Sequence, residues 1–227
     1  MESQAEGTAN AAIETQANSC AEVEMCALPA GLSRLGLLVA LHDVLNALKK
    51  LHVLKKVHGG ISSATIYMNG DGIVVLGKKR QNVDEASPFP PYEVVCDGKK
   101  GDAQSDIYSL GAFFYLYLKG SPPETSSNRR KPKKDPYIPL SVTGDTKGNL
   151  EACVDKALGL YPDERWATVD EWLENLPLTH EEELQGRIDL LKTRLRLLHK
   201  KSFWALGWGW RLLVLLVLVI LYFAYIH

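Results

Sequence analysis

The segment from residue 33 to residue 54 constrains the fold most, because it predicts a long amphipathic helix followed directly by a hairpin. Its apolar side chains recur at intervals that place them on one helix face: Leu37, Leu38, Leu41, Val44, Leu45, Leu48 and Leu51. Asp43, Lys49 and Lys50 exclude a membrane span here. Short β-rich runs at 66–68 and 73–76 flank an Asn-Gly turn, which predicts a β-hairpin.

The overall composition predicts one ordinary globular core and, by charge alone, no particular partner. The chain has 227 residues, 26 Lys and Arg, 27 Asp and Glu, and a formal net charge of -1. A globally basic nucleic-acid-binding protein is therefore not indicated, and no nucleic-acid partner is expected. Cys20, Cys26, Cys96 and Cys153 are far apart and form no C-x-x-C pair. Neither a zinc site nor a disulfide framework is predicted.

The two ends of the chain differ from its middle. Residues 1–30 contain five Glu, no Lys or Arg and no apolar periodicity, which predicts a disordered acidic leader. Residues 212–226 carry no polar group except tyrosine hydroxyls. A helix over 204–226 would be about 33 Å long and would cover a hydrocarbon core of about 30 Å. We therefore expect a transmembrane anchor at 203–227, with a buried core helix as the alternative.

The charges around this apolar segment predict its orientation. Basic residues precede it as far as Arg211, and only His227 follows it, so the positive-inside rule places the N-terminal part in the cytosol. We expect a single-pass, tail-anchored protein whose partners include the lipid bilayer. The lack of a basic cluster after the span favours the endoplasmic reticulum over the mitochondrial outer membrane.

Residues 179–202 predict an amphipathic juxtamembrane helix with an apolar heptad. The apolar positions follow one another at spacings of four, three, four and three: Leu184, Ile188, Leu191, Leu195 and Leu198. This spacing is typical of a short coiled-coil seam, through which the chain would associate with itself or with another chain. A solvated stalk that lies on anionic lipid is the alternative.

Motifs in the middle of the chain resemble the C-terminal lobe of protein kinases. Residues 105–111 (SDIYSLG) resemble the family's S-D-[VI]-[WY]-S-L-G helix start, and residues 91–93 (PYE) resemble its A-P-E motif. Residues 161–165 (YPDER) are similar to its D-P-x-x-R segment. The resemblance covers most of residues 31–178. It implies a mainly α domain with a short β-hairpin and no N-lobe, followed in this chain by the C-terminal transmembrane helix.

The resemblance also implies structural roles for four residues. Asp106 is expected to hold the backbone of the catalytic loop, and His58 is expected to pack beneath that loop. Glu93 and Arg165 match the two partners of an ion pair in the family, so a buried Glu93–Arg165 pair is expected.

The residues that carry kinase chemistry are missing from this pattern. The family's catalytic loop follows H-R-D-x-K-x-x-N, whereas residues 58–65 are HGGISSAT. The resemblance therefore implies Gly60 at the position of the base, Ser62 at that of the lysine and Thr65 at that of the metal-binding asparagine. Lys78 falls near the D-F-G position, where an ammonium would repel magnesium. No glycine-rich phosphate loop precedes residue 33, so no catalytic residue, cofactor or metal site is expected.

The sequence as a whole predicts a catalytically inactive, membrane-bound kinase-like lobe that serves as a protein-binding scaffold or regulator and is not an enzyme. Its protein partner would be a kinase or a membrane protein. A coiled-coil membrane tether with a dispensable lobe is the alternative, and an active phosphotransferase is the least favoured. The basic segment 129–134 (RRKPKK) stays open between a solvated loop, a lipid contact and a docking or nuclear-targeting role.

Overall fold

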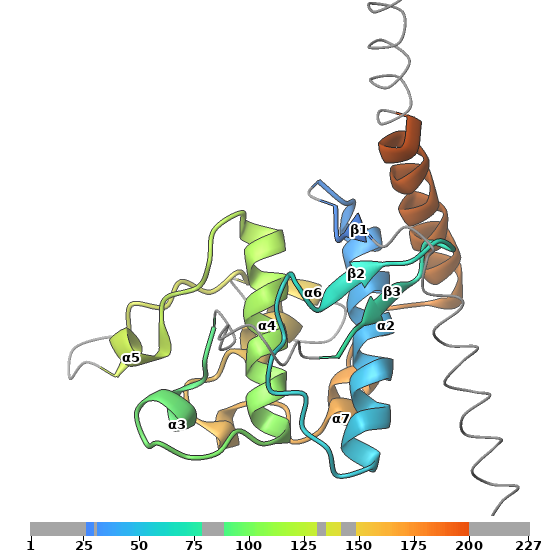
Figure 1. Ribbon diagram of the computed structural model, residues 1–227. Coiled ribbons are helices and arrows are strands. Elements are labelled where there is room, and N and C mark those ends of the chain that lie inside the picture. The colour runs from blue at the N-terminus through green and yellow to red at the C-terminus, as the bar shows by residue number, and fades with distance from the viewer. Residues whose placement is uncertain (1–25, 30, 79–88, 131–134, 142–148, 200–227) are drawn as a thin grey trace, which may run out of the picture.

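The computed structural model describes residues 26–29, 31–78, 89–130, 135–141 and 149–199, and the fold is reported for these residues. In chain order the elements are β1 (Cys26–Ala27), α2 (Arg34–Val53), β2 (Ile66–Met68), β3 (Val74–Leu76), α3 (Tyr92–Val95), α4 (Ala103–Lys119), α5 (Ser126–Arg129), α6 (Leu150–Ala157), the 3-10 helix η1 (Pro162–Glu164), α7 (Val169–Glu174) and a last helix over 180–199. The molecule is mainly helical, and its small sheet lies against α2 (Figure 1).

The long helix α2 lies where the apolar periodicity predicts it. The hydroxyl of Ser33 caps its first turn by accepting a hydrogen bond from the Gly36 N–H at 3.0 Å. The predicted apolar face is buried except for the half-buried Leu51, and Leu41, Val44, Leu45 and Leu48 are fully enclosed. The prediction of a helix over 33–54 is confirmed.

The predicted hairpin is present, and a third strand joins it. The side-chain oxygen of Asn69 accepts hydrogen bonds from the N–H groups of Asp71 and Ile73, both at 3.0 Å, and so closes the turn between β2 and β3. β1 adds an antiparallel strand on the other side of β2, with Cys26 opposite Met68. Leu28 is also buried. The lobe therefore includes residues 26–29, which the sequence analysis assigned to the leader at 1–30; residues 1–25 lie outside the described part of the chain.

The core forms around α4, which is buried without interruption from Ser105 to Tyr115. α2 and α6 both pack on it (Figure 1). The contact with α6 depends on Gly111, since a Cβ atom there would lie 2.9 Å from the Cβ of Ala157. Trp166 and Trp172 complete the core as a stacked pair with ring centroids 6.4 Å apart. The helix that opens with the most specific motif of the sequence is thus the centre of the fold.

The last helix, 180–199, packs against the start of α2 and is part of the lobe. Leu190 is fully buried, and a Cβ atom at Gly186 would lie 2.5 Å from a methyl group of Val39. The C-terminal end of the helix projects past the other elements (Figure 1). The predicted division into a lobe at 31–178 and a separate juxtamembrane helix at 179–202 therefore needs correction, because residues 180–199 share the core.

The predicted transmembrane anchor and single-pass membrane localisation are not supported. Within the described residues, no helix is both long enough and apolar enough to cross a bilayer. Residues 203–227, to which the anchor was assigned, lie outside those residues. The fold class is accordingly corrected, for the residues that the structure describes, to a mainly helical lobe with a short antiparallel sheet and no helix able to cross a membrane.

Candidate functional site

The loop at residues 58–65 is fixed by the first turn of α4. The buried carboxylate of Asp106 accepts a hydrogen bond from the His58 N–H through one oxygen and from the Gly59 N–H through the other, each at 2.8 Å. The first of these oxygens also lies 3.0 Å from Nε2 of His52. Asp106 thus holds the loop backbone through two charge-assisted hydrogen bonds.

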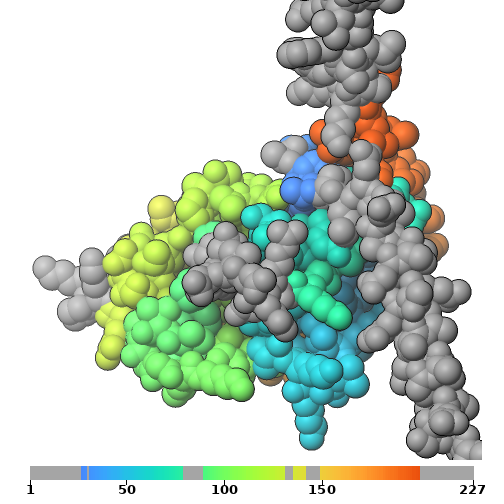
Figure 2. Space-filling model, viewed as in Figure 1, coloured from blue at the N-terminus to red at the C-terminus, as the bar shows by residue number. Residues whose placement is uncertain are grey.

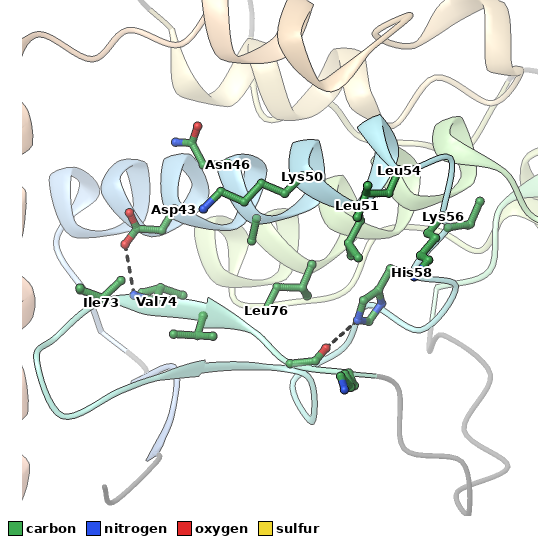
Figure 3. A pocket seen from close by; sticks show the side chains of 15 residues that line it. Asp43, Asn46, Lys50, Leu51, Leu54, Lys56, His58, Ile73, Val74 and Leu76 are labelled. Carbon is green, nitrogen blue, oxygen red and sulfur yellow. Dashed lines mark hydrogen bonds between the residues drawn. The ribbon is translucent and has the colours of Figure 1, made fainter. Parts of the chain in front are cut away.

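His58 ties the same loop to the end of β3. Its Nε2 donates a hydrogen bond to the carbonyl oxygen of Gly77 at 2.7 Å (Figure 3). This nitrogen is therefore occupied by the backbone. A general base needs a ring nitrogen that can reach a substrate proton, and Nε2 of His58 does not meet that requirement.

The three positions assigned to lost catalytic groups are all buried. The Thr65 hydroxyl accepts a hydrogen bond from the Ser62 N–H at 3.0 Å and lies 3.0 Å from the Gly60 carbonyl oxygen, so it closes the loop on itself. No carboxylate or ammonium group occurs at these positions. No group of three or more His, Cys, Asp or Glu side chains able to hold a metal occurs among the described residues.

The Glu93–Arg165 ion pair expected from the resemblance is present. The two guanidinium Nη atoms of Arg165 donate to the two carboxylate oxygens of Glu93 at 2.9 and 2.8 Å, and both residues are buried. Ser105 donates a further hydrogen bond to Glu93 at 2.7 Å. Burial acts to raise the pKa of Glu93, but the hydrogen bonds from Arg165 and Ser105 outweigh it and hold that pKa below its ordinary value. The pair joins α3 to the segment that follows η1.

The basic segment 129–134 begins with a residue of the interior. Arg129 is buried, donates to both carboxylate oxygens of Asp135 and donates from Nη1 to the Leu158 carbonyl oxygen at 2.6 Å. Its guanidinium also lies 4.4 Å from the ring centre of Tyr137. Arg129 therefore has a structural role, and the solvated-loop, lipid-contact, docking and nuclear-targeting roles do not apply to it. Residues 131–134 lie outside the described residues.

An apolar cleft of about 700 Å³ opens between α2 and β3. Leu51 of α2 and Leu76 of β3 face each other across it (Figure 3). Three apolar residues on its border are strongly exposed: Leu54 at 65%, Val57 at 43% and Ile73 at 43%. We call this feature the α2/β3 cleft. The sequence analysis missed it, although Leu54 and Val57 continue apolar character past the end of the buried stripe.

The charged groups around the α2/β3 cleft are mostly basic. Lys50, Lys56 and Lys78 line it and are exposed to solvent. Asp43 is the acidic residue among its lining, and its carboxylate binds Arg187 at 2.5 and 2.6 Å and accepts the Val74 N–H at 3.1 Å. The cleft can therefore accept an apolar side chain with acidic neighbours. Lys78, expected at the D-F-G position, lies on this rim.

The comparisons with known proteins indicate weak homology to protein kinases. Sporulation-specific protein 1 of Saccharomyces cerevisiae is 28% identical over 78% of this chain and 39% of its own length. Serine/threonine-protein kinase PknB is 36% identical over 37% of this chain and 14% of its own length in Mycolicibacterium smegmatis, and 34% identical over 61% and 25% in Mycobacterium leprae. The chain thus spans 39% or less of each of these relatives. No protein-family model matches it.

The solved structure "PpkA-294 apo form" superposes with a TM-score of 0.48 and 26% identity, covering 60% of this chain and 52% of that chain. The homology to the PknB kinases supports a kinase-like fold.

Proposed function

Because the chain is weakly homologous to protein kinases and has a kinase-like fold, we propose that it is a catalytically inactive kinase-like lobe that acts by binding another protein. The observation that carries this proposal is the loop at residues 58–65. Asp106 holds its backbone, but Gly60, Ser62 and Thr65 stand where the resemblance expects a base, a lysine and a metal ligand.

The chemical argument rests on what phosphoryl transfer requires. A kinase positions a carboxylate near the substrate hydroxyl and holds magnesium against the phosphates with acidic and amide side chains. Glycine at position 60 offers no side chain, and the Thr65 hydroxyl is used within its own loop. Asp106 thus keeps the conformation of the loop, but the loop lacks the side chains that phosphoryl transfer requires.

The recognition surface in this proposal is the α2/β3 cleft. It offers apolar walls, exposed apolar borders at Leu54 and Ile73, and a rim of lysines. A matching ligand is a peptide segment of another protein in which Leu, Met or an aromatic residue has Asp or Glu beside it. Burial of the apolar side chain would supply binding free energy, and the acidic residues would give specificity by facing the lysines of the rim.

Catalytic inactivity predicts that magnesium-ATP does not stabilise the folded chain. Magnesium-ATP at millimolar concentration is expected to shift the melting temperature of the purified chain by less than about 1 °C, since a ligand stabilises only in proportion to its binding to the folded state. Differential scanning fluorimetry measures this shift, and an active kinase serves as the positive control. A shift of several degrees, or transfer of labelled phosphate to a protein substrate, would contradict catalytic inactivity.

The recognition surface predicts a peptide preference. Peptides selected from a random display library on the full chain are expected to share an apolar residue flanked by Asp or Glu, and their affinity should fall at least about tenfold in the variant L54Q/I73Q. Both positions are exposed, so the fold should persist. Ile138→Gln, at a site 63% exposed and outside the cleft, is the matched control. Selected peptides without acidic residues, or equal binding to L54Q/I73Q, would refute this surface.

A further inference from the structure

The contacts of helix 180–199 with the lobe fix its rotation about its own axis. Arg187 forms a bidentate ion pair with Asp43 of α2. Asp189 accepts a hydrogen bond from the Ser33 hydroxyl at 2.9 Å. Leu190 is buried, and Gly186 lies too close to Leu35 and Val39 to allow a side chain. These contacts come from the face that carries residues 186, 187 and 190. The heptad residues belong to a neighbouring face and cannot turn inward while these contacts hold.

The apolar heptad is consequently left partly exposed to solvent, although Leu191 also lies against Gly72 of the hairpin turn. Leu184, Ile188, Leu191, Leu195 and Leu198 are exposed by 53, 44, 42, 64 and 37%. We call these five residues the exposed seam. At about 1.5 Å per residue they extend over about 21 Å of one helix. Single exposed leucines are ordinary on protein surfaces, but a continuous apolar stripe of this kind is typical of an interaction site.

The charges beside the exposed seam do not favour pairing with a second copy of the chain. With Leu191 at heptad position d and Ile188 at position a, the flanking e and g positions are Gln185, Arg187, Lys192, Arg194 and His199. None is acidic. Arg187 is paired with Asp43 and Arg194 is buried, so Lys192 is the lysine or arginine exposed at these positions, and in a homodimer it would meet no acidic e or g residue of the other copy. Between residues 190 and 199 the helix exposes the basic side chains of Lys192 and Arg196, buries Arg194, and carries no carboxylate.

We propose that the exposed seam binds an acidic amphipathic helix of another protein. The partner helix would have Leu or Ile at its a and d positions and Glu or Asp beside them, so that its apolar stripe covers Ile188, Leu191 and Leu195 while its carboxylates face Lys192 and Arg196. This surface is separate from the α2/β3 cleft, so it adds an interaction that the proposed function does not include. Of the two kinds of association expected from the heptad, the proposal selects association with another protein over self-association.

Two synthetic peptides of three heptads test this inference. Both have Leu and Ile at the a and d positions; one has Glu and the other Lys at e and g. The full chain is kept in a non-ionic detergent because residues 212–226 are apolar. Fluorescence anisotropy should show at least about tenfold tighter binding of the acidic peptide, and Lys192→Glu should reduce this preference several-fold. I188Q/L195Q should weaken binding of the acidic peptide by about tenfold or more, whereas L54Q/I73Q and Ile138→Gln should not.

Two outcomes would overturn the inference. One is equal affinity for the acidic and basic peptides, which would mean that the charges do not select the partner. The other is an oligomer of the wild-type chain, in analytical ultracentrifugation, that dissociates in I188Q/L195Q, because the seam would then be occupied by a second copy. L54Q/I73Q changes the α2/β3 cleft, whereas I188Q/L195Q changes the exposed seam. A wrong assignment of one binding surface therefore gives a different result from a wrong assignment of the other.

Discussion

Replacement of Arg165 with leucine is expected to lower the free energy of unfolding by about 3–5 kcal/mol. The variant leaves the Glu93 carboxylate buried without its partner, and it removes the donors that Arg165 directs at the carbonyl oxygens of Gly159 and Leu160. A loss of this size is a large fraction of the stability of an ordinary domain. Urea unfolding followed by circular dichroism measures it, and a large part of the variant should be unfolded at 37 °C.

An exposed ion pair supplies the control for this variant. Arg34 binds Glu151 at 2.7 Å, but the two side chains are 50 and 28% exposed. Arg34→Leu should cost no more than about 1 kcal/mol, because solvent screens the pair. The double variant E93L/R165L should lose less than the sum of its two single variants, because no unpaired buried charge remains. If R165L were no less stable than R34L, the Glu93–Arg165 pair would not anchor the lobe.

Acid titration provides a second measurement on the same pair. Although burial acts to raise it, the pKa of Glu93 in the folded protein lies below its ordinary value because of Arg165 and Ser105. The group therefore contributes stability above the pKa of the unfolded chain, and this contribution is lost as the pH falls through the folded pKa. The pH dependence of the unfolding free energy below about pH 4.5 should be weaker in Glu93→Gln than in the wild type.

Asp106→Asn is expected to release the loop at residues 58–65 and to cost about 2–4 kcal/mol. The amide keeps the size of the side chain, but it presents an NH₂ group to one of the two backbone N–H donors of His58 and Gly59. One donor then loses its acceptor in a buried position. Hydrogen exchange should show faster exchange at these two amides, and urea unfolding should show the loss of stability.

Asp102→Asn is the matched control, because it makes the same chemical change four residues earlier. Asp102 caps α4 by accepting the Ser105 N–H at 2.9 Å, and it is exposed. Asparagine is about as good an N-cap as aspartate, so this variant should keep its stability within about 0.5 kcal/mol. Equal stability of the two variants would show that Asp106 is not needed to hold the loop.

The sequence predicted those parts of the molecule that have strong local signals. The apolar periodicity of α2, the Asn-Gly turn between β2 and β3, and the motif around Asp106 each specify their own structure over a few residues. The Glu93–Arg165 pair, 72 residues apart, was predicted only through the resemblance to protein kinases. No local sequence pattern would have predicted that these two residues form an ion pair.

The parts that the sequence did not predict depend on contacts between distant segments. The heptad of residues 184–198 suggested that the helix would bury its heptad face, in an oligomer. The lobe instead binds the face with Gly186, Arg187 and Leu190, because Asp43, 144 residues away from Arg187, pairs with it. β1 has two residues and therefore no periodicity to detect, and the burial of Arg129 depends on Asp135.

The position of Asp43 links two surfaces that are otherwise separate. One of its carboxylate oxygens accepts the Val74 N–H at the edge of the cleft, and both oxygens bind Arg187 of the last helix. A rotation of that helix that removes Arg187 leaves a partly buried carboxylate unneutralised in the cleft wall and adds a negative charge beside Lys50. The single carboxylate of Asp43 therefore both fixes the last helix and sets the charge of this wall of the cleft.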